Sequence, residues 1–267
     1  MLHGGPAAPG EAAPLARGLA GPFRVAEPWQ RGSGDKPLTV AAHVEDLHGL
    51  ITEGPCGPAP AIVGESWGAM LALAYAAAHP ETAGPLVIVG CGTFDAISRA
   101  HMRETLDERT GPELRQALQR LEGECPEPVE RLPRKYQMMR ALYDFDPVGE
   151  DPSSESEAPP FDARAHAETW NDMLRLQGQG IYPTAFRAIR SPVLMLHGAY
   201  DPHPGAMIRA SLVPFIPHLE YREWERCGHS PWRERHVREE FFTFLRDWIA
   251  AHIGISSISR PRSRSTA

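Results

Sequence analysis

The pentapeptide GESWG at residues 64–68 constrains the fold of this chain more than any other stretch. A short apolar run, residues 61–63, leads into it, and an alanine- and leucine-rich segment, residues 70–78, follows it. This order predicts a strand, a sharp turn and a helix. Glycines on both sides of the turn remove the Cβ atoms that would collide with the strand and the helix. We expect the Ser66 hydroxyl to lie at the helix N-terminus, where unpaired N–H groups and the helix dipole favour negative charge.

Other apolar runs are continuous rather than alternating, which is typical of parallel strands covered by helices on both faces. They predict strands at residues 86–89, 193–196 and 219–224, and a further strand is expected at residues 23–26. Apolar residues at helical spacing predict helices between and after the strands. The alternation indicates an α/β fold with a mostly parallel sheet flanked by helices. The expected helices are residues 12–19, 40–52, 206–212 and 237–253.

Residues 98–190 interrupt this alternation with helical segments and no convincing strand. The sequence TGPE at residues 110–113 predicts a capping box with proline near the helix start. Further helices are expected at residues 136–143 and 165–176, and the acidic, Ser/Pro-rich residues 149–160 predict an exposed loop. We therefore expect the chain to be divided into a core at 1–97 and 191–254, a helical cap at 98–190 and a disordered tail at 255–267.

The composition excludes several classes of protein. A chain of 267 residues, 42% of them apolar, can bury one core with an insertion. The net charge of -7 argues against nucleic acid as a partner, because phosphate binding needs a concentrated basic surface. The four cysteines lack the spacing of a disulfide framework or metal site, and no apolar run reaches the length of a membrane span. We expect a cytoplasmic protein, without a signal peptide or membrane contact.

Two later loops carry the residues that a serine nucleophile needs, namely a base and an acid that orients the base. Asp201 follows the strand predicted at 193–196, and His229 follows the strand predicted at 219–224. Open parallel sheets place their sites at the carboxyl ends of the strands, so Ser66, Asp201 and His229 are expected to meet there. The chain order is Ser, Asp, His.

Alternatives to these two residues stand nearby in the sequence. Asp95 follows the strand predicted at 86–89 and is a second candidate for the acid. His197 and His203 compete with His229 for the role of base. Because His197 is at a strand end beside Gly198, we expect it to be packed, and we expect His203 to line a pocket.

Several short motifs, taken together, resemble those of the α/β-hydrolases. They are HGGP at residues 3–6, QRGSG at residues 30–34, the pentapeptide at 64–68, Gly198-x-x-Asp201 and Gly228-His229. More narrowly, the chain resembles the proline iminopeptidase branch, which carries HGGPG, DQRG and GxSWG motifs. It departs from that pattern at two positions. Ala7 stands in place of the last glycine of HGGPG, and Trp29 stands in place of the aspartate of DQRG.

The resemblance implies a serine hydrolase that cleaves an ester or amide bond through an acyl-enzyme. Ser66 would attack the carbonyl carbon, His229 would act as base and then acid, and Asp201 would orient the imidazole. The Trp67 N–H, with that of Gly4 or Gly5, would form the oxyanion hole. No metal or organic cofactor is implied, and the partner would be a small ester or a short peptide. A carboxylesterase and a catalytically silent binding protein remain alternatives.

The motif residues around Ser66 and the predicted cap raise separate expectations. His3 is expected to hold its own loop, and Glu65 and Trp67 to shape the turn. In the resembling peptidases, acidic cap residues bind the free amino group of the substrate. Glu104, Glu168 and Asp172 are conceivable counterparts here, but as helix residues they are expected to be solvated charges, so the substrate-binding residues stay unknown.

The resembling fold begins with two strands before the HGG loop, and none precedes His3 here. Their absence would leave the strand predicted at 23–26 as an exposed edge, which favours aggregation or a homodimer. A reading frame that starts too late and a naturally short form are both open explanations.

Overall fold

Four parallel strands form the centre of the computed structural model, which describes residues 1–149 and 158–253. Their order across the sheet is β1-β2-β3-β4, so neighbours in the sheet follow one another along the chain. The predicted strands 86–89 and 219–224 are confirmed, and the other two end slightly later than predicted. The strands are β1 (Ile62–Glu65), β2 (Leu86–Val89), β3 (Val193–Gly198) and β4 (Leu219–Trp224).

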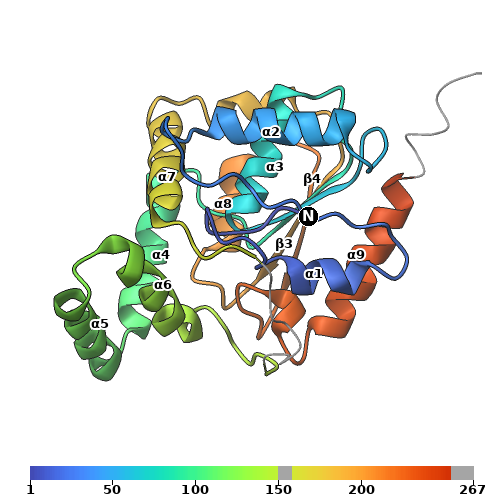
Figure 1. Ribbon diagram of the computed structural model, residues 1–267. Helices are drawn as coiled ribbons and strands as arrows, with labels where there is room; N and C mark the ends of the chain where they lie inside the picture. The colour runs from blue at the N-terminus through green and yellow to red at the C-terminus, as the bar shows by residue number, and fades with distance from the viewer. Residues whose placement is uncertain (150–157, 254–267) are drawn as a thin grey trace, which may run out of the picture.

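Helices cover both faces of this sheet (Figure 1). On one face lie α2 (Val40–Glu53), α3 (Trp67–Ala78) and α8 (Gly205–Leu212); on the other lie α1 (Ala13–Leu19) and α9 (Arg238–Ile253). Because successive strand residues point to opposite faces, Ile62 packs on the α3 side and its neighbour Val63 packs on the α9 side. The predicted α/β class, with a parallel sheet between two helical layers, is confirmed.

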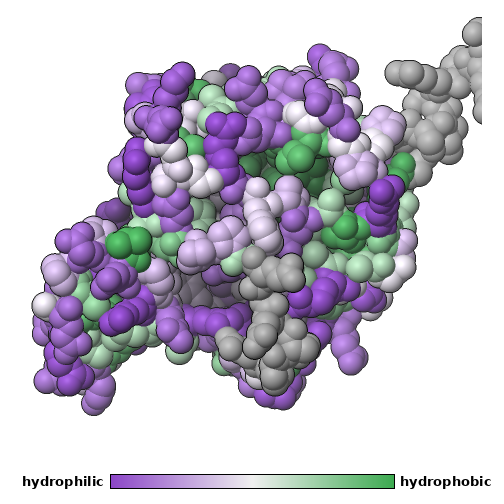
Figure 2. Space-filling model, in the orientation of Figure 1, coloured by the Kyte–Doolittle hydropathy of each residue, from purple (hydrophilic) through white to green (hydrophobic). Residues whose placement is uncertain are grey.

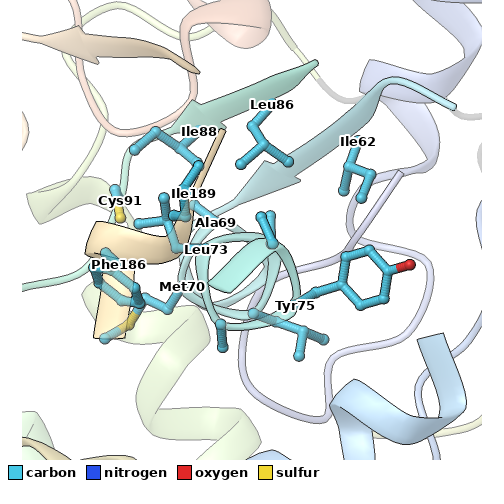
Figure 3. Close-up of a cluster of buried hydrophobic side chains, with 14 of the residues drawn as sticks. Ile62, Ala69, Met70, Leu73, Tyr75, Leu86, Ile88, Cys91, Phe186 and Ile189 are labelled. Atoms are coloured by element: carbon cyan, nitrogen blue, oxygen red, sulfur yellow. The ribbon is translucent and has the colours of Figure 1, made fainter. Parts of the chain in front are cut away.

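Helix α3 is buried along most of its length. Every residue from Trp67 to Ala76 is buried, because the helix lies between the sheet and neighbouring helices. Figure 3 shows strand side chains such as Leu86 and Ile88 directed toward this helix, with Phe186 beside Met70. Phe186 belongs to the short helix η2 (Thr184–Ala188), far along the chain. Burial on all sides fixes the position of the turn that precedes α3.

The first residues of the chain extend the sheet beyond β1. Leu2 forms a parallel bridge with Gly64, and its N–H donates to Val63 O at 2.8 Å. The Glu65 N–H donates back to Leu2 O at 3.1 Å. The HGG loop therefore begins directly beside β1, the strand that precedes Ser66.

The strand predicted at residues 23–26 is wrong. No ladder forms there; the Met1 amino group donates to Ala26 O at 2.7 Å instead. Phe23 and Val25 instead pack against the core on the α9 face. With no neighbouring strand to share hydrogen bonds, the segment stays irregular.

The segment between β2 and β3 contains a helical lobe, seen at the lower left in Figure 1. In Figure 2, this lobe is mostly hydrophilic on the face in view, with a hollow between it and the body. The loop predicted at 149–160 falls largely outside the described residues, and the tail at 255–267 falls wholly outside them. Besides η2, the described helices of this segment are α4 (Ala96–Arg109), α5 (Pro112–Glu124), α6 (Pro128–Met139), η1 (Arg140–Leu142) and α7 (Ala163–Gly178).

The capping box predicted at residues 110–113 does not form. Gly111 is the N-cap of α5, without a side-chain cap, and Pro112 is at the first helical position as expected. The Thr110 hydroxyl donates to Leu106 O at 2.7 Å and so stabilises the end of α4. Because the linker between α4 and α5 is short, Thr110 can bond to the end of α4 instead of capping α5.

Helix α7 packs against the beginning of α2 through two of the acidic candidates. Glu168 Oε2 accepts the Leu38 N–H, and Asp172 Oδ2 accepts the Val40 N–H, both at 2.8 Å. These carboxylates lie at the positive end of α2, where negative charge is stabilising. Their role here is structural, so the expectation of freely solvated charges is wrong, whereas Glu104 is exposed on α4. Among the helices at residues 1–149 and 158–253, none combines the length and apolar character that a bilayer crossing requires.

Candidate active site

Ser66 occupies the sharp turn between β1 and α3. Its backbone has φ 51° and ψ −116°, outside the ordinary helix and strand regions. A Cβ atom on Gly64 would lie 2.2 Å from Gly68 O, and one on Gly68 would lie 2.2 Å from Leu2 O. Both glycines are therefore required sterically. The turn presents Ser66 at the N-terminus of α3, as the sequence predicts.

Asp201 and His229 meet at the same end of the sheet. Each lies on the loop that follows its strand, and Asp201 Oδ2 is 2.6 Å from His229 Nδ1. The Asp201 side chain is wholly buried, while that of His229 is 16% exposed. This distance is that of a charge-assisted hydrogen bond, which fixes the orientation of the imidazole.

Ser66 and His229 both adjoin the link between Val89 and Gly90 at the end of β2. The Ser66 N–H donates to Val89 O at 2.8 Å. A Cβ atom on Gly90, whose φ is +54°, would lie 3.0 Å from Nδ1 and Cε1 of His229. The glycine at this position leaves room for the imidazole to lie over the strand end beside the serine turn.

The charges of this pair follow from its surroundings. Burial opposes ionisation of Asp201, but the adjacent imidazoles outweigh burial and hold the pKa of Asp201 well below its usual range. Burial likewise opposes charge on His229, yet the Asp201 carboxylate and its hydrogen bond raise the pKa of His229 to about 9. The pair therefore strongly favours a carboxylate beside an imidazolium.

Asp95, the alternative acid, has a different role in the structure. It is the N-cap of α4, where its carboxylate accepts the Ser98 N–H at 2.8 Å and the Ser98 hydroxyl at 2.7 Å. Such a cap satisfies free N–H groups of the first helical turn. Asp201, rather than Asp95, is the carboxylate that contacts His229.

The two other histidines also surround Asp201. His197 is buried, as expected, with Nε2 at 2.9 Å from His203 O and 3.2 Å from Asp201 Oδ2. His203 Nδ1 lies 3.0 Å from Asp201 Oδ1. In the described part of the chain, one group of side chains has the spacing of metal ligands. It consists of Asp201, His203 and His229, whose ligand atoms all lie within 4.8 Å of one another. Direct hydrogen bonds join the carboxylate to both rings, an arrangement typical of an acid–base group.

The HGG loop is fixed to the serine turn by Gln30. Gln30 N donates to His3 Nε2 at 3.1 Å, and its side-chain amide donates to His3 O at 2.9 Å. The amide oxygen accepts the Trp67 indole N–H at 2.8 Å. His3 Nδ1 contacts Gly4 O at 3.0 Å, so the expectation that His3 holds its own loop is confirmed. Gln30 thus joins two motifs that are far apart in the sequence.

Glu65 contributes a contact that the sequence did not predict. Its buried carboxyl accepts the Gly4 N–H at 3.1 Å. This N–H is therefore already engaged, which leaves Gly5 as the candidate oxyanion donor of the HGG loop. Burial, together with the nearby Glu11 carboxylate, raises the pKa of Glu65 to about 8.

Replacing Glu65 with glutamine is expected to stabilise the protein increasingly as the pH rises. The folded state retains the Glu65 proton up to about pH 8, whereas the unfolded state loses it near pH 4.5, so wild-type stability falls between these values. The slope is at most about 1.4 kcal/mol per pH unit. Glutamine keeps the acceptor for Gly4 and cannot ionise.

Urea unfolding at about pH 5 and about pH 8 measures this effect. The difference in free energy of unfolding between Glu65→Gln and wild type should grow with pH. The exposed Glu108→Gln on α4 is the matched control and should show no such growth. A Glu65→Gln difference that is constant with pH would contradict the prediction.

Glu234 is a second buried carboxylate, and no sequence motif identifies it. Its two oxygens accept the N–H groups of Gly228 at 2.8 Å, Phe145 at 2.9 Å and Asp146 at 2.7 Å. The His229 N–H donates to Tyr143 O at 2.9 Å. The loop that carries His229 is thereby joined to the segment that leaves the helical lobe after η1.

Solved structures with the same fold span almost the whole chain. The crystal structure of VinJ has a TM-score of 0.65 and 21% identity, and covers 94% of this chain and 89% of its own. A putative lipase from Acinetobacter baumannii AYE has a TM-score of 0.61 and 18% identity, with 94% and 83% covered. The proline iminopeptidase of Mycobacterium smegmatis has a TM-score of 0.61 and 18% identity, with 96% and 91% covered. At such identities the likeness establishes the fold alone.

Sequence comparison identifies the family more directly. None of the curated proteins matches this chain. The family model described as "Alpha/beta hydrolase family" matches residues 1–241, a range that includes the serine turn, the Asp201 loop and the His229 loop. Since the match covers most of its length, the chain belongs to the alpha/beta hydrolase family.

Proposed function

We propose that the chain is a serine hydrolase that cleaves an ester or amide bond through an acyl-enzyme intermediate. The observation that carries the proposal is the 2.6 Å hydrogen bond between Asp201 and His229 at the sheet end where Ser66 occupies its turn. A serine nucleophile, a base and an acid that orients the base are the parts such chemistry needs. Membership of a hydrolase family supports the same conclusion.

In the proposed reaction, Ser66 Oγ attacks the carbonyl carbon as His229 Nε2 takes the hydroxyl proton. The N–H groups of Trp67, at the start of α3, and Gly5 would stabilise the oxyanion. The tetrahedral intermediate collapses when His229 returns the proton to the leaving alcohol or amine. Water, deprotonated by the same histidine, then attacks the acyl-enzyme and releases the acid and Ser66. Asp201 stays ionised throughout and stabilises the imidazolium.

A fluorophosphonate probe tests the proposal directly, because it phosphonylates only an activated serine. Intact-mass and peptide mass spectrometry of the folded protein should locate one adduct, on Ser66. Prior heat unfolding should abolish the labelling. A well-folded sample with no adduct would favour the alternative, a catalytically silent binding protein.

Activity is expected to increase with pH up to about 9. Below its raised pKa of about 9, His229 is an imidazolium with no lone pair for the Ser66 proton, so kcat/KM should fall with acidity. Initial rates across the neutral to alkaline range, with the background subtracted using Ser66→Ala, would give the profile. A kcat/KM that is constant from neutral pH upward would contradict this prediction.

An amine-bearing substrate is a second candidate that one observation favours. Asp144 lies close enough to His229 to influence its charge, and its carboxylate would place negative charge beside the site, whereas Glu65 keeps its proton up to about pH 8. A protonated amino group would be attracted to the Asp144 carboxylate. The likeness to a proline iminopeptidase points the same way, whereas the likeness to a lipase favours esters. Prolyl and alanyl arylamides compared with short-chain aryl esters would separate the two substrate classes.

A further inference from the structure

Two partly exposed imidazoles contact the Asp201 carboxylate, one on each oxygen, and the buried His197 lies 3.2 Å from Oδ2. Oδ2 contacts His229 Nδ1 at 2.6 Å. Oδ1 accepts two hydrogen bonds from His203, one from the backbone N–H at 2.9 Å and one from Nδ1 at 3.0 Å. An acid that only orients one base needs no second imidazole, so the role of His203 calls for an explanation.

We propose that His203 is a positioning residue that holds Oδ1 of Asp201 and thereby limits the share of the carboxylate charge that acts on His229. The inference rests on the proposed function of His229 as the base. It assigns His203 no contact with the substrate. It makes His203 a determinant of the pH at which the base becomes available.

The surrounding contacts hold His203 in one orientation. Its ring stacks on that of His229, with centroids 4.9 Å apart and an interplanar angle of 27°. Its carbonyl oxygen is 2.9 Å from Nε2 of the buried His197. The Tyr143 ring lies against both His203 and His229, at centroid distances of 6.0 and 5.6 Å. Rotation of the His203 side chain away from Asp201 would break the stack and the hydrogen bond together.

The charges around Asp201 give this hydrogen bond its effect. In the described residues, the ion-pair partners of Asp201 are three histidines and no lysine or arginine. Burial lowers the pKa of His203, despite the opposing effect of Asp201, so His203 acts near neutral pH as an uncharged donor. A hydrogen-bond donor on Oδ1 draws negative charge away from Oδ2, the oxygen that contacts His229. Without it, His229 would face a less stabilised anion and hold its proton more tightly.

Other titratable groups also face this pair, and none of them replaces His203. Besides Asp201 itself, Glu65 and Asp144 favour charge on His229. Glu11 is close enough to be affected by His229, and Arg140 influences both Glu11 and Asp144. These four groups, Glu65, Asp144, Glu11 and Arg140, belong to segments other than the 197–203 loop, so a substitution at His203 leaves them in place.

Two variants separate hydrogen bonding from packing. His203→Leu removes the side-chain donor and keeps apolar volume, whereas His203→Asn places an amide N–H near the former Nδ1. Both variants lose the ring stack, so a difference between them reports the donor alone. The pKa of His229 would be measured in each by imidazole NMR titration, and kcat/KM would be measured across pH.

For His203→Leu we expect the pKa of His229 to rise by about one pH unit, and the acid limb of the kcat/KM profile to move up with it. Near pH 7, kcat/KM should be about tenfold lower than in wild type. At a pH above the limb, kcat/KM should return to the wild-type value. His203→Asn should retain the wild-type limb. The proposal is overturned if the two variants titrate alike, or if His203→Leu loses activity equally at every pH. The NMR titration needs no turnover, so it tests His203 even if Ser66 proves unreactive and the proposed function fails.

Discussion

Replacing Ser66 with alanine is expected to lower kcat by at least about 10⁴-fold and to abolish fluorophosphonate labelling. Alanine has no hydroxyl to attack the substrate, while the oxyanion donors and His229 remain in place. Steady-state hydrolysis with the best ester or arylamide of the panel measures the loss. Ser211→Ala, on α8 and away from the site, is the matched control and should retain the wild-type rate.

Substitutions at Ser66 are also expected to show, in the free energy of unfolding, that the backbone of the turn is strained. Ser66 has a φ of 51°, which alanine inherits and glycine adopts at little cost. Ser66→Gly should therefore be more stable to urea than Ser66→Ala, by about 1 kcal/mol after the entropy cost of glycine. Residual activity in Ser66→Ala near the wild-type level would exclude Ser66 as nucleophile. A less stable glycine variant would contradict the strain argument.

Asp201→Asn is expected to lower kcat by about 10⁴-fold. An asparagine amide can donate to His229 Nδ1, which would place the imidazole proton on Nε2, the atom that must accept the Ser66 proton. The shape of the side chain is unchanged, so the fold should survive. Near-UV circular dichroism would check the packing, and steady-state kinetics would give the loss.

Asp95→Asn is the matched control for this carboxylate. Asparagine is as good an N-cap as aspartate, so α4 should remain capped and the rate should change little. If Asp95→Asn harmed turnover more than Asp201→Asn, the assignment of the acid would be wrong.

The elements that the sequence predicts well are those whose signal is local. The buried strands 86–89 and 219–224 have the predicted bounds, because continuous apolar runs bounded by turns have few alternatives. Ser66, Asp201 and His229 could be selected because each follows a predicted strand, and parallel strands share one carboxyl edge. The need for glycines beside Ser66 could also be predicted, because Cβ atoms would collide with the strand and the helix at a sharp turn.

The remaining features depend on partners that no local pattern specifies. The sequence predicts a strand at Phe23 and Val25, yet this segment joins no ladder, and Ala26 O accepts a hydrogen bond from the Met1 amino group. Glu65 could be assigned to the turn, but its hydrogen bond to Gly4 joins residues 61 positions apart. Glu234 is one of several charged residues near the start of α9, and its partners at 145 and 146 precede it by almost 90 positions. Such contacts arise only when the chain has folded.

The Glu234 contacts also limit how this protein can be re-engineered. A designer who wished to change specificity by exchanging the helical lobe with that of a relative would naturally cut at the ends of the lobe helices. Residues 143–148, however, contact the His229 loop through Glu234 and Tyr143 O. A graft that displaced their backbone would remove two of the three N–H donors to the buried Glu234 carboxylate and leave that of Gly228, at a cost of about a few kcal/mol. An exchange of the lobe should therefore end at η1, and residues 143–148 should be kept because they hold the His229 loop.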